Sequence, residues 1–136
     1  MKPLAYISFI LASGTLMAAS CTKGSPNITG GGKGGTATIV VTPEHHGEFV
    51  DSCKVYIKYG TNDAPANGVY DDSIACVLAD TTPVAVFTGL TTGLYYVYGQ
   101  GYHSTYTPPY IKGGVPVTVQ VQDTNVVYLP TYSYQP

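Results

Sequence analysis

The feature that most constrains this fold is a strict alternation of apolar and polar residues along several short segments. In residues 115–122, four valines alternate with proline, threonine and glutamine. Alternate side chains of an extended strand point to opposite faces, so this pattern predicts a strand with one buried face. Residues 36–42 show the same alternation. Pro116 falls on the polar side, which favours a sheet edge because proline has no N–H to donate.

Five more strand-like segments lie between and after these two, and turn-forming residues separate all seven. Clusters of Gly, Pro, Asn and Asp, such as residues 60–68, are typical of loops. No convincing helical stripe follows Cys21, so we predict an all-β fold, a single antiparallel sandwich within residues 36–136. The further strands are expected at residues 50–59, 73–79, 84–88, 94–102 and 125–130.

The charge content argues against a nucleic-acid-binding protein. The chain has 136 residues, enough for one domain, and 10% of them are charged. Six lysines are the only basic side chains besides histidine, against eight carboxylates, which gives a net charge of -2. A nucleic-acid binder needs many cations to neutralise phosphates, so we expect no nucleic-acid partner.

The first twenty residues have the layout of a secretory signal. Lys2 precedes an uncharged, mostly apolar run over residues 4–17, and small residues follow. We therefore expect residues 1–20 to be a signal peptide. The alternative is an uncleaved anchor helix, but the apolar run is short for a membrane span of about 20 residues.

The end of this segment, Ala18-Ala19-Ser20-Cys21, resembles the lipobox of bacterial lipoproteins. The resemblance implies that Cys21 is acylated and becomes the mature N-terminus, with the lipid bilayer as its partner. Thr22, where that family's inner-membrane members carry Asp, implies the outer membrane, with its face left open. Residues 21–35 contain GGGKGG and are expected to form a flexible tether.

Two cysteines remain in the expected sandwich. By alternation Cys53 shares a face with Val55, and Cys76 shares one with Leu78, so all four are expected to point inward. In an exported domain two such thiols predict one disulfide, between Cys53 and Cys76. The alternative is a pair of buried free thiols that act as small apolar side chains.

Residues 84–102 contain the pattern Phe, Gly-Leu, Gly-x-Tyr and resemble transthyretin-like and carboxypeptidase-regulatory-like sandwich domains. A tight corner between two strands needs Gly89 and Gly93 for backbone freedom. Tyr96 and Tyr98 are expected to point outward. The resemblance and the alternation together imply inward positions for Phe87, Leu90, Tyr95 and Val97.

Tyrosine is unusually common, with 13 in the chain and most of them after residue 94. Outward tyrosines on a sheet can form a platform for a sugar or a peptide, because each ring has an apolar face and a polar tip. The candidate binding residues are Tyr96, Tyr98, Tyr102 and Tyr106. The alternative is that tyrosine simply suits half-buried strands.

Metal binding has weak candidates in His45, His46 and Glu48, which His103 could join from another loop. Adjacent residues of an extended segment point in opposite directions, and no metal-type spacing is present, so we expect a solvated turn and no cofactor. Residues 71–72 are two adjacent aspartates, but they lack the alternating acids of a calcium loop.

No nucleophile motif or catalytic constellation is evident, so the expected protein is not an enzyme. The sequence predicts a membrane-anchored cell-envelope lipoprotein with a structural, adhesion or accessory-binding role, whose partner is an envelope protein or a glycan. A second hypothesis is a tyrosine-rich module that binds a glycan or a peptide. A third is a metal-dependent enzyme that uses the loop of His45 and His46.

Overall fold

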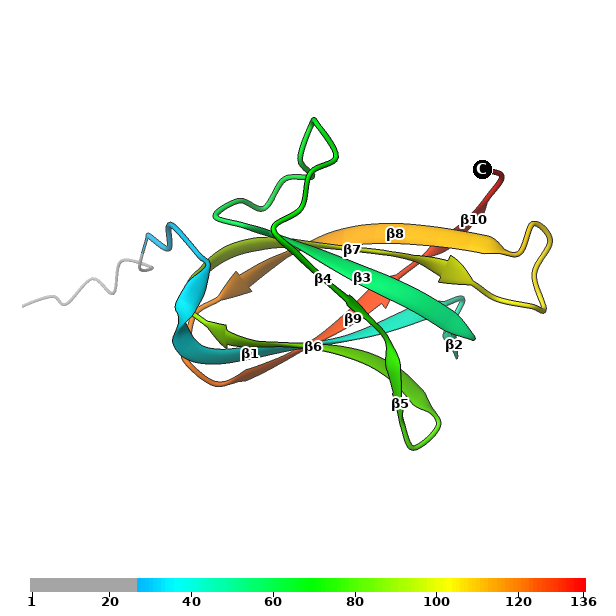
Figure 1. Cartoon of the computed structure of the whole chain (residues 1–136), viewed down its shortest axis with the longest axis horizontal. Coiled ribbons are helices and arrows are strands. Elements are labelled where there is room, and N and C mark those ends of the chain that lie inside the picture. The colour runs from blue at the N-terminus through cyan, green and yellow to red at the C-terminus, as the bar shows by residue number, and fades with distance from the viewer. Residues whose placement is uncertain (1–26) are drawn as a thin grey trace, which may run out of the picture.

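The structure is a computed structural model that describes residues 27–136. Ten β-strands in these residues form two sheets that pack together (Figure 1). The all-β class predicted from the sequence is confirmed. The predicted signal peptide and Cys21 lie outside the described residues. Residues 27–136 contain no helix long and apolar enough to span a membrane.

The first sheet is built around β1 (Lys33–His45). On one side β1 pairs antiparallel with β6 (Thr82–Leu90), and on the other it pairs in parallel with β9 (Thr124–Pro130). Strand β5 (Val77–Ala79) extends the sheet beyond β6, and the short β2 (Glu48–Phe49) pairs with the end of β1. The parallel pair differs from the wholly antiparallel arrangement that we expected, and it places the last long strand beside the first.

The second sheet is antiparallel throughout. Strand β10 (Tyr132–Tyr134) covers only Tyr110 to Lys112 of β8 (Tyr110–Val119), so within residues 27–136 no strand pairs with the edge of β8 at Pro116, as the sequence predicted. In spatial order the strands are β10 (Tyr132–Tyr134), β8 (Tyr110–Val119), β7 (Gly93–Tyr102), β3 (Ser52–Tyr59) and β4 (Asp72–Ala75).

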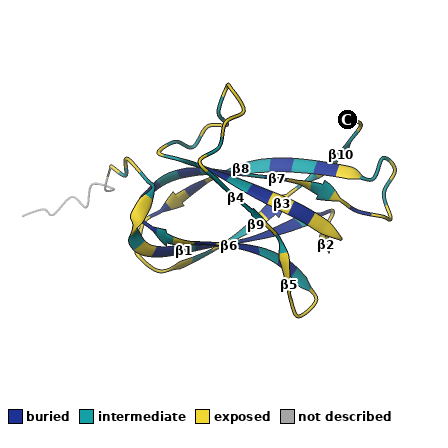
Figure 2. Ribbon diagram, in the orientation of Figure 1, coloured by how far each residue is buried: buried dark blue, intermediate teal, exposed yellow. Residues whose placement is uncertain are grey.

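The core lies between the two sheets and is made by the inward residues of both (Figure 2). Both strands of the corner predicted within residues 84–102, β6 and β7, contribute to this core, because alternate residues of each are buried. Burying aliphatic and aromatic side chains contributes roughly 1.5–3 kcal/mol each, which makes this layer the main source of stability. The four inward positions predicted for residues 84–102 are fully buried: Phe87, Leu90, Tyr95 and Val97.

The corner between β6 and β7 also holds the segment that enters the domain. The Tyr95 hydroxyl donates to the carbonyl of Thr91 at 2.7 Å and accepts from the N–H of Gly32 at 2.9 Å. The Leu94 N–H donates to the carbonyl of Gly30 at 2.6 Å. The glycine-rich segment, expected to be a free tether up to residue 35, is therefore bound to the domain from Gly30 onward.

The strand predicted at residues 73–79 is in fact two strands. The chain leaves the second sheet at Cys76, so β4 pairs with β3 while β5 pairs with β6. Because the chain crosses between the sheets here, the alternation of buried and exposed residues in β4 does not continue into β5. Leu78 is consequently 67% exposed, and the prediction that it points inward was wrong.

Candidate functional site

Most of the tyrosines project from one surface, the outer face of the second sheet, which we call the tyrosine face. Since Tyr95 and Val97 of β7 are buried, the intervening residues of β7 and their cross-strand partners point outward. The loop residue Tyr70 stacks on this face as well. The strand tyrosines on the face are Tyr56, Tyr96, Tyr98, Tyr102, Tyr110, Tyr132 and Tyr134.

Three of these side chains form a row across β7, β8 and β10. Tyr102 is directly opposite Tyr110, and Tyr110 is directly opposite Tyr134. Their ring centroids are 6.2 Å apart in the first pair and 6.3 Å apart in the second. Aromatic pairs at such separations stabilise one another beyond their burial, so the row is a fixed surface feature.

A second aromatic group lies further along the same strands. Tyr98 and Tyr56 are directly opposite on β7 and β3, and the ring of Tyr70 stacks on that of Tyr98 with centroids 5.7 Å apart. Gln100 links the pair: its side-chain oxygen accepts from Tyr98 and its amide donates to Tyr56, both at 3.4 Å. Burial raises the pKa of the Tyr98 and Tyr70 hydroxyls, so both remain neutral donors at neutral pH.

Tyr96 lies next to this group on β7, and its side chain lies over Gly114 of β8, which has no side chain. Gly114 is the partner of Tyr98 on β8, and a side chain at Gly114 would collide with the ring and hydroxyl of Tyr96. The Tyr96 side chain therefore extends from β7 over β8 and occupies the space that a side chain at Gly114 would need.

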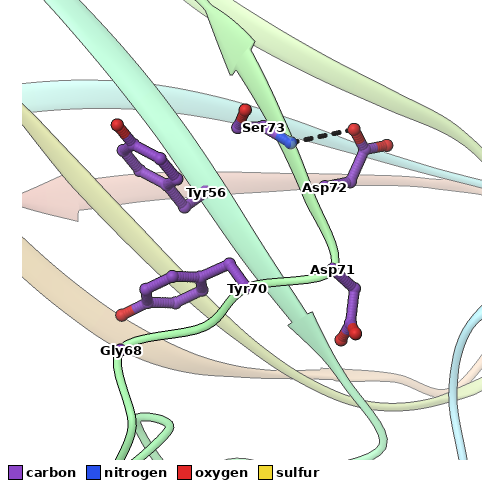
Figure 3. Close-up of a pocket in the computed structure, with 6 residues that line it drawn as sticks. All are labelled: Tyr56, Gly68, Tyr70, Asp71, Asp72 and Ser73. Carbon is purple, nitrogen blue, oxygen red and sulfur yellow. Dashed lines mark hydrogen bonds between the residues drawn. The ribbon is translucent and has the colours of Figure 1, made fainter.

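A recess of about 400 Å³ opens at the β4 edge of this face. Figure 3 shows the rings of Tyr56 and Tyr70 projecting to the same side of it, whereas the carboxylate of Asp71 points away. The recess is open rather than enclosed, and its size falls within the range of ligand sites.

The two aspartates beside the recess are occupied by structural contacts. Asp71 pairs with Lys58 at 3.2 Å and accepts from the backbone N–H of Tyr59 at 2.7 Å. Asp72 accepts from the N–H of Ser73 at 2.8 Å and lies 3.5 Å from the ammonium of Lys33. Burial, with these carboxylates close by, raises the pKa of Tyr59 to about 12. Both aspartates thus hold the loop in place rather than offering free ligands.

A separate polar cluster at the end of β1 brings together all three histidines of the chain around Tyr106. His45 is almost fully buried, and its Nδ1–H donates to the carbonyl of Thr131 at 2.8 Å. Its Nε2 then accepts from the hydroxyl of Ser133 at 3.2 Å. These contacts give His45 a structural role, because they connect the end of β1 to β10.

The neighbouring His103 is also buried, and its Nε2 has no hydrogen-bond partner. The nearest charged atom is a carboxylate oxygen of Glu48 at 3.7 Å, and the Tyr106 hydroxyl lies 3.4 Å from that same oxygen. Among residues 27–136, no group of three His, Cys, Asp or Glu side chains could hold a metal ion. The structure thus brings His103 near Glu48, while His46 is exposed on the turn.

The four tyrosines predicted as binding residues do not all share one surface. Tyr96, Tyr98 and Tyr102 lie on the tyrosine face, as alternation along one strand requires. Tyr106 lies in the loop after β7 and packs against His45, so it is not part of the tyrosine face, and its role in binding stays a prediction. Sequence reasoning missed the residues that other strands bring to the face. Tyr56 alternates with buried residues in the same way as Lys54 and Lys58, and this pattern could have placed it on the outer face. Nothing in the sequence located Tyr70.

Cys53 and Cys76 meet near the start of β3, where the backbone N–H of Cys76 donates to the carbonyl of Cys53 at 2.8 Å. Both are free thiols, so the predicted disulfide is not formed in this structure. The contact with the Cys76 thiol and burial raise the pKa of Cys53, and the same contact lowers the pKa of Cys76.

Comparison of the chain with protein-family models, with curated proteins and with solved structures finds no match. The resemblance of residues 84–102 to transthyretin-like domains therefore remains a prediction. The geometry of the described residues identifies the tyrosine face as the main candidate site.

Proposed function

We propose that this protein is a membrane-anchored, non-enzymatic lipoprotein of the cell envelope whose sandwich domain binds a glycan on the tyrosine face. The signal-like segment and the lipobox-like residues that end at Cys21 support the anchor. Ordered tyrosine rings support the binding role, because each ring offers an apolar face to sugar C–H groups and a hydroxyl to sugar hydroxyls.

The observation that carries this proposal is the unequal distribution of tyrosine between the two outer faces. On the first sheet, Val40 lies between Val86 and Val126 in the central row, and Tyr128 is the strand tyrosine that points outward there. If tyrosine were present only because it suits half-buried strands, both faces would carry it equally. The concentration on one face supports a role in binding.

Binding of the full-length chain, purified in detergent, to a glycan array tests this function. We expect Tyr98→Ala to weaken binding to the best glycan about tenfold, roughly 1.4 kcal/mol, since Tyr98 is the centre of the aromatic group. Tyr128→Ala removes a 61% exposed tyrosine from the opposite face and is the matched control. An array without hits, or equal loss in both variants, would contradict the proposal.

The anchor is tested separately in cells. We expect an inhibitor of the lipoprotein signal peptidase to cause a precursor with residues 1–20 still attached to accumulate. Substitution of Cys21 by Ser is expected to prevent labelling with palmitate and to release the protein from the membrane fraction. Unchanged processing and unchanged membrane association of that variant would exclude the lipoprotein assignment.

A further inference from the structure

The lysines of the described residues are concentrated on the tyrosine face. Lys54, Lys58 and Lys112 all point outward from the second sheet, and Lys33 lies at the start of β1. Lys58 and Lys33 are paired with carboxylates. Within residues 27–136, Lys54 and Lys112 have no carboxylate within 4.0 Å, so two ammonium groups on this face lack a counter-charge.

The two unpaired lysines lie in one line across the sheet. Lys112 of β8 is opposite Gln100 of β7, and Gln100 is opposite Lys54 of β3. Neighbouring strands are about 4.8 Å apart, so the two lysine backbones are separated by roughly 10 Å. This line runs between the row that contains Tyr102 and the aromatic group centred on Tyr98.

Aromatic rings hold both ammonium groups close to the surface. The Lys112 Nζ lies 4.3 Å from the centroid of the Tyr134 ring, and the Lys54 Nζ lies 5.4 Å from that of Tyr56. A cation above a ring is attracted by the ring quadrupole but keeps its charge. An incoming anion would therefore meet two positioned cations between two aromatic groups.

From this arrangement we infer that the ligand of the tyrosine face is an acidic polysaccharide, whose carboxylate or sulfate groups pair with Lys54 and Lys112 while its sugar rings lie on the tyrosines. This inference rests on the proposed glycan-binding function. Charge complementarity favours it, because the face is positive in a chain whose net charge is -2. A nucleic acid is disfavoured, since nucleic-acid binders carry an excess of basic side chains, whereas this chain has six lysines against eight carboxylates.

The experiment measures binding of the full-length chain in detergent to polygalacturonate, dextran sulfate, neutral dextran and single-stranded poly(dT). We expect one of the two acidic polymers to bind at least tenfold more tightly than dextran and poly(dT), with an affinity that falls as salt is added. The stronger of the two identifies carboxylate or sulfate as the recognised group.

Variants then separate this inference from the function on which it rests. K54Q/K112Q is expected to weaken binding of the acidic polymer about tenfold, while K33Q, which removes a lysine outside the line, leaves it unchanged. If Tyr98→Ala weakens glycan binding but K54Q/K112Q has no effect, the anionic ligand is wrong and the glycan function stands. Equal loss with K33Q, or tightest binding to poly(dT), also overturns the inference. Absence of any glycan binding overturns both.

Discussion

At the scale of single residues, the contact between Cys53 and Cys76 makes two chemically similar thiols unequal. Cys53 is 8% exposed and faces the core, whereas Cys76 is half-buried at the point where the chain changes sheet. A thiol that donates to a neighbouring sulfur stabilises the thiolate form of that neighbour. The more accessible Cys76 therefore ionises first, and Cys53 remains a thiol.

This difference predicts an order of chemical modification in the reduced protein. Because alkylation proceeds through the thiolate, we expect iodoacetamide to label Cys76 before Cys53 and at a lower pH than an ordinary thiol requires. Cys53→Ala, which removes the donor at this position, is expected to move the pH dependence of Cys76 labelling upward. Mass spectrometry of tryptic peptides over a pH series measures both rates. Faster labelling of Cys53 in the native protein would show that the assignment is reversed.

At the scale of elements, the corner between β6 and β7 depends on close approach of two backbones. Gly93 has φ of 155°, and a side chain there would collide with the backbone of Gly30 and Gly31. The sequence pattern correctly assigned Gly93 to a tight corner. The reason is more specific than turn geometry, because Gly93 makes room for the segment that enters β1.

Gly93→Ala is therefore expected to destabilise the domain by about 1–3 kcal/mol, the usual cost of forcing extra atoms into a packed site. Gly47→Ala is the matched control, since Gly47 also has a positive φ, 81°, but has no atom within 4 Å of the added methyl group. Gly47→Ala is expected to lower the free energy of unfolding only by the backbone strain of an alanine at positive φ, about 1–2 kcal/mol. Urea unfolding followed by tyrosine fluorescence measures both, and a smaller loss for Gly93→Ala than for Gly47→Ala would contradict this account.

The elements were largely predictable because alternation is a local property. Phe87, Tyr95 and Val97 are buried as expected, since each lies in a strand that stays in one sheet. The prediction failed at Leu78, where the chain changes sheet, because that change depends on long-range pairing with β6 rather than on local pattern. The parallel pairing of β1 with β9 was invisible in the sequence for the same reason.

At the scale of the whole molecule, the candidate site was only partly predictable, because several strands build the tyrosine face together. Tyr96, Tyr98 and Tyr102 follow from alternation along one strand. Register adds Tyr56 and Tyr110 from neighbouring strands, and a long loop adds the ring of Tyr70. Register and loop packing are set by the global fold, and they also align the two unpaired lysines.

The whole-molecule architecture also depends on the last six residues of the chain, which connect the two sheets. After β9 the chain passes through Thr131, whose backbone N–H and hydroxyl both lie 2.9 Å from the carbonyl of Glu44. It then enters the second sheet as β10, where Ser133 contacts the buried His45. Removing this segment would take away both hydrogen-bond partners of the His45 ring and expose the edge of β8.

Deletion of residues 131–136 is therefore expected to lower the free energy of unfolding by about 3 kcal/mol or more, because leaving buried polar groups unpaired costs about 1–3 kcal/mol each. Deletion of residues 135–136, which are exposed and follow β10, is the matched control and should leave stability unchanged. Urea unfolding by tyrosine fluorescence suits this chain, which has no tryptophan. Sedimentation would additionally reveal association through the uncovered β8 edge. Equal midpoints for the two deletions would mean that β10 is not what holds the two sheets together at this end.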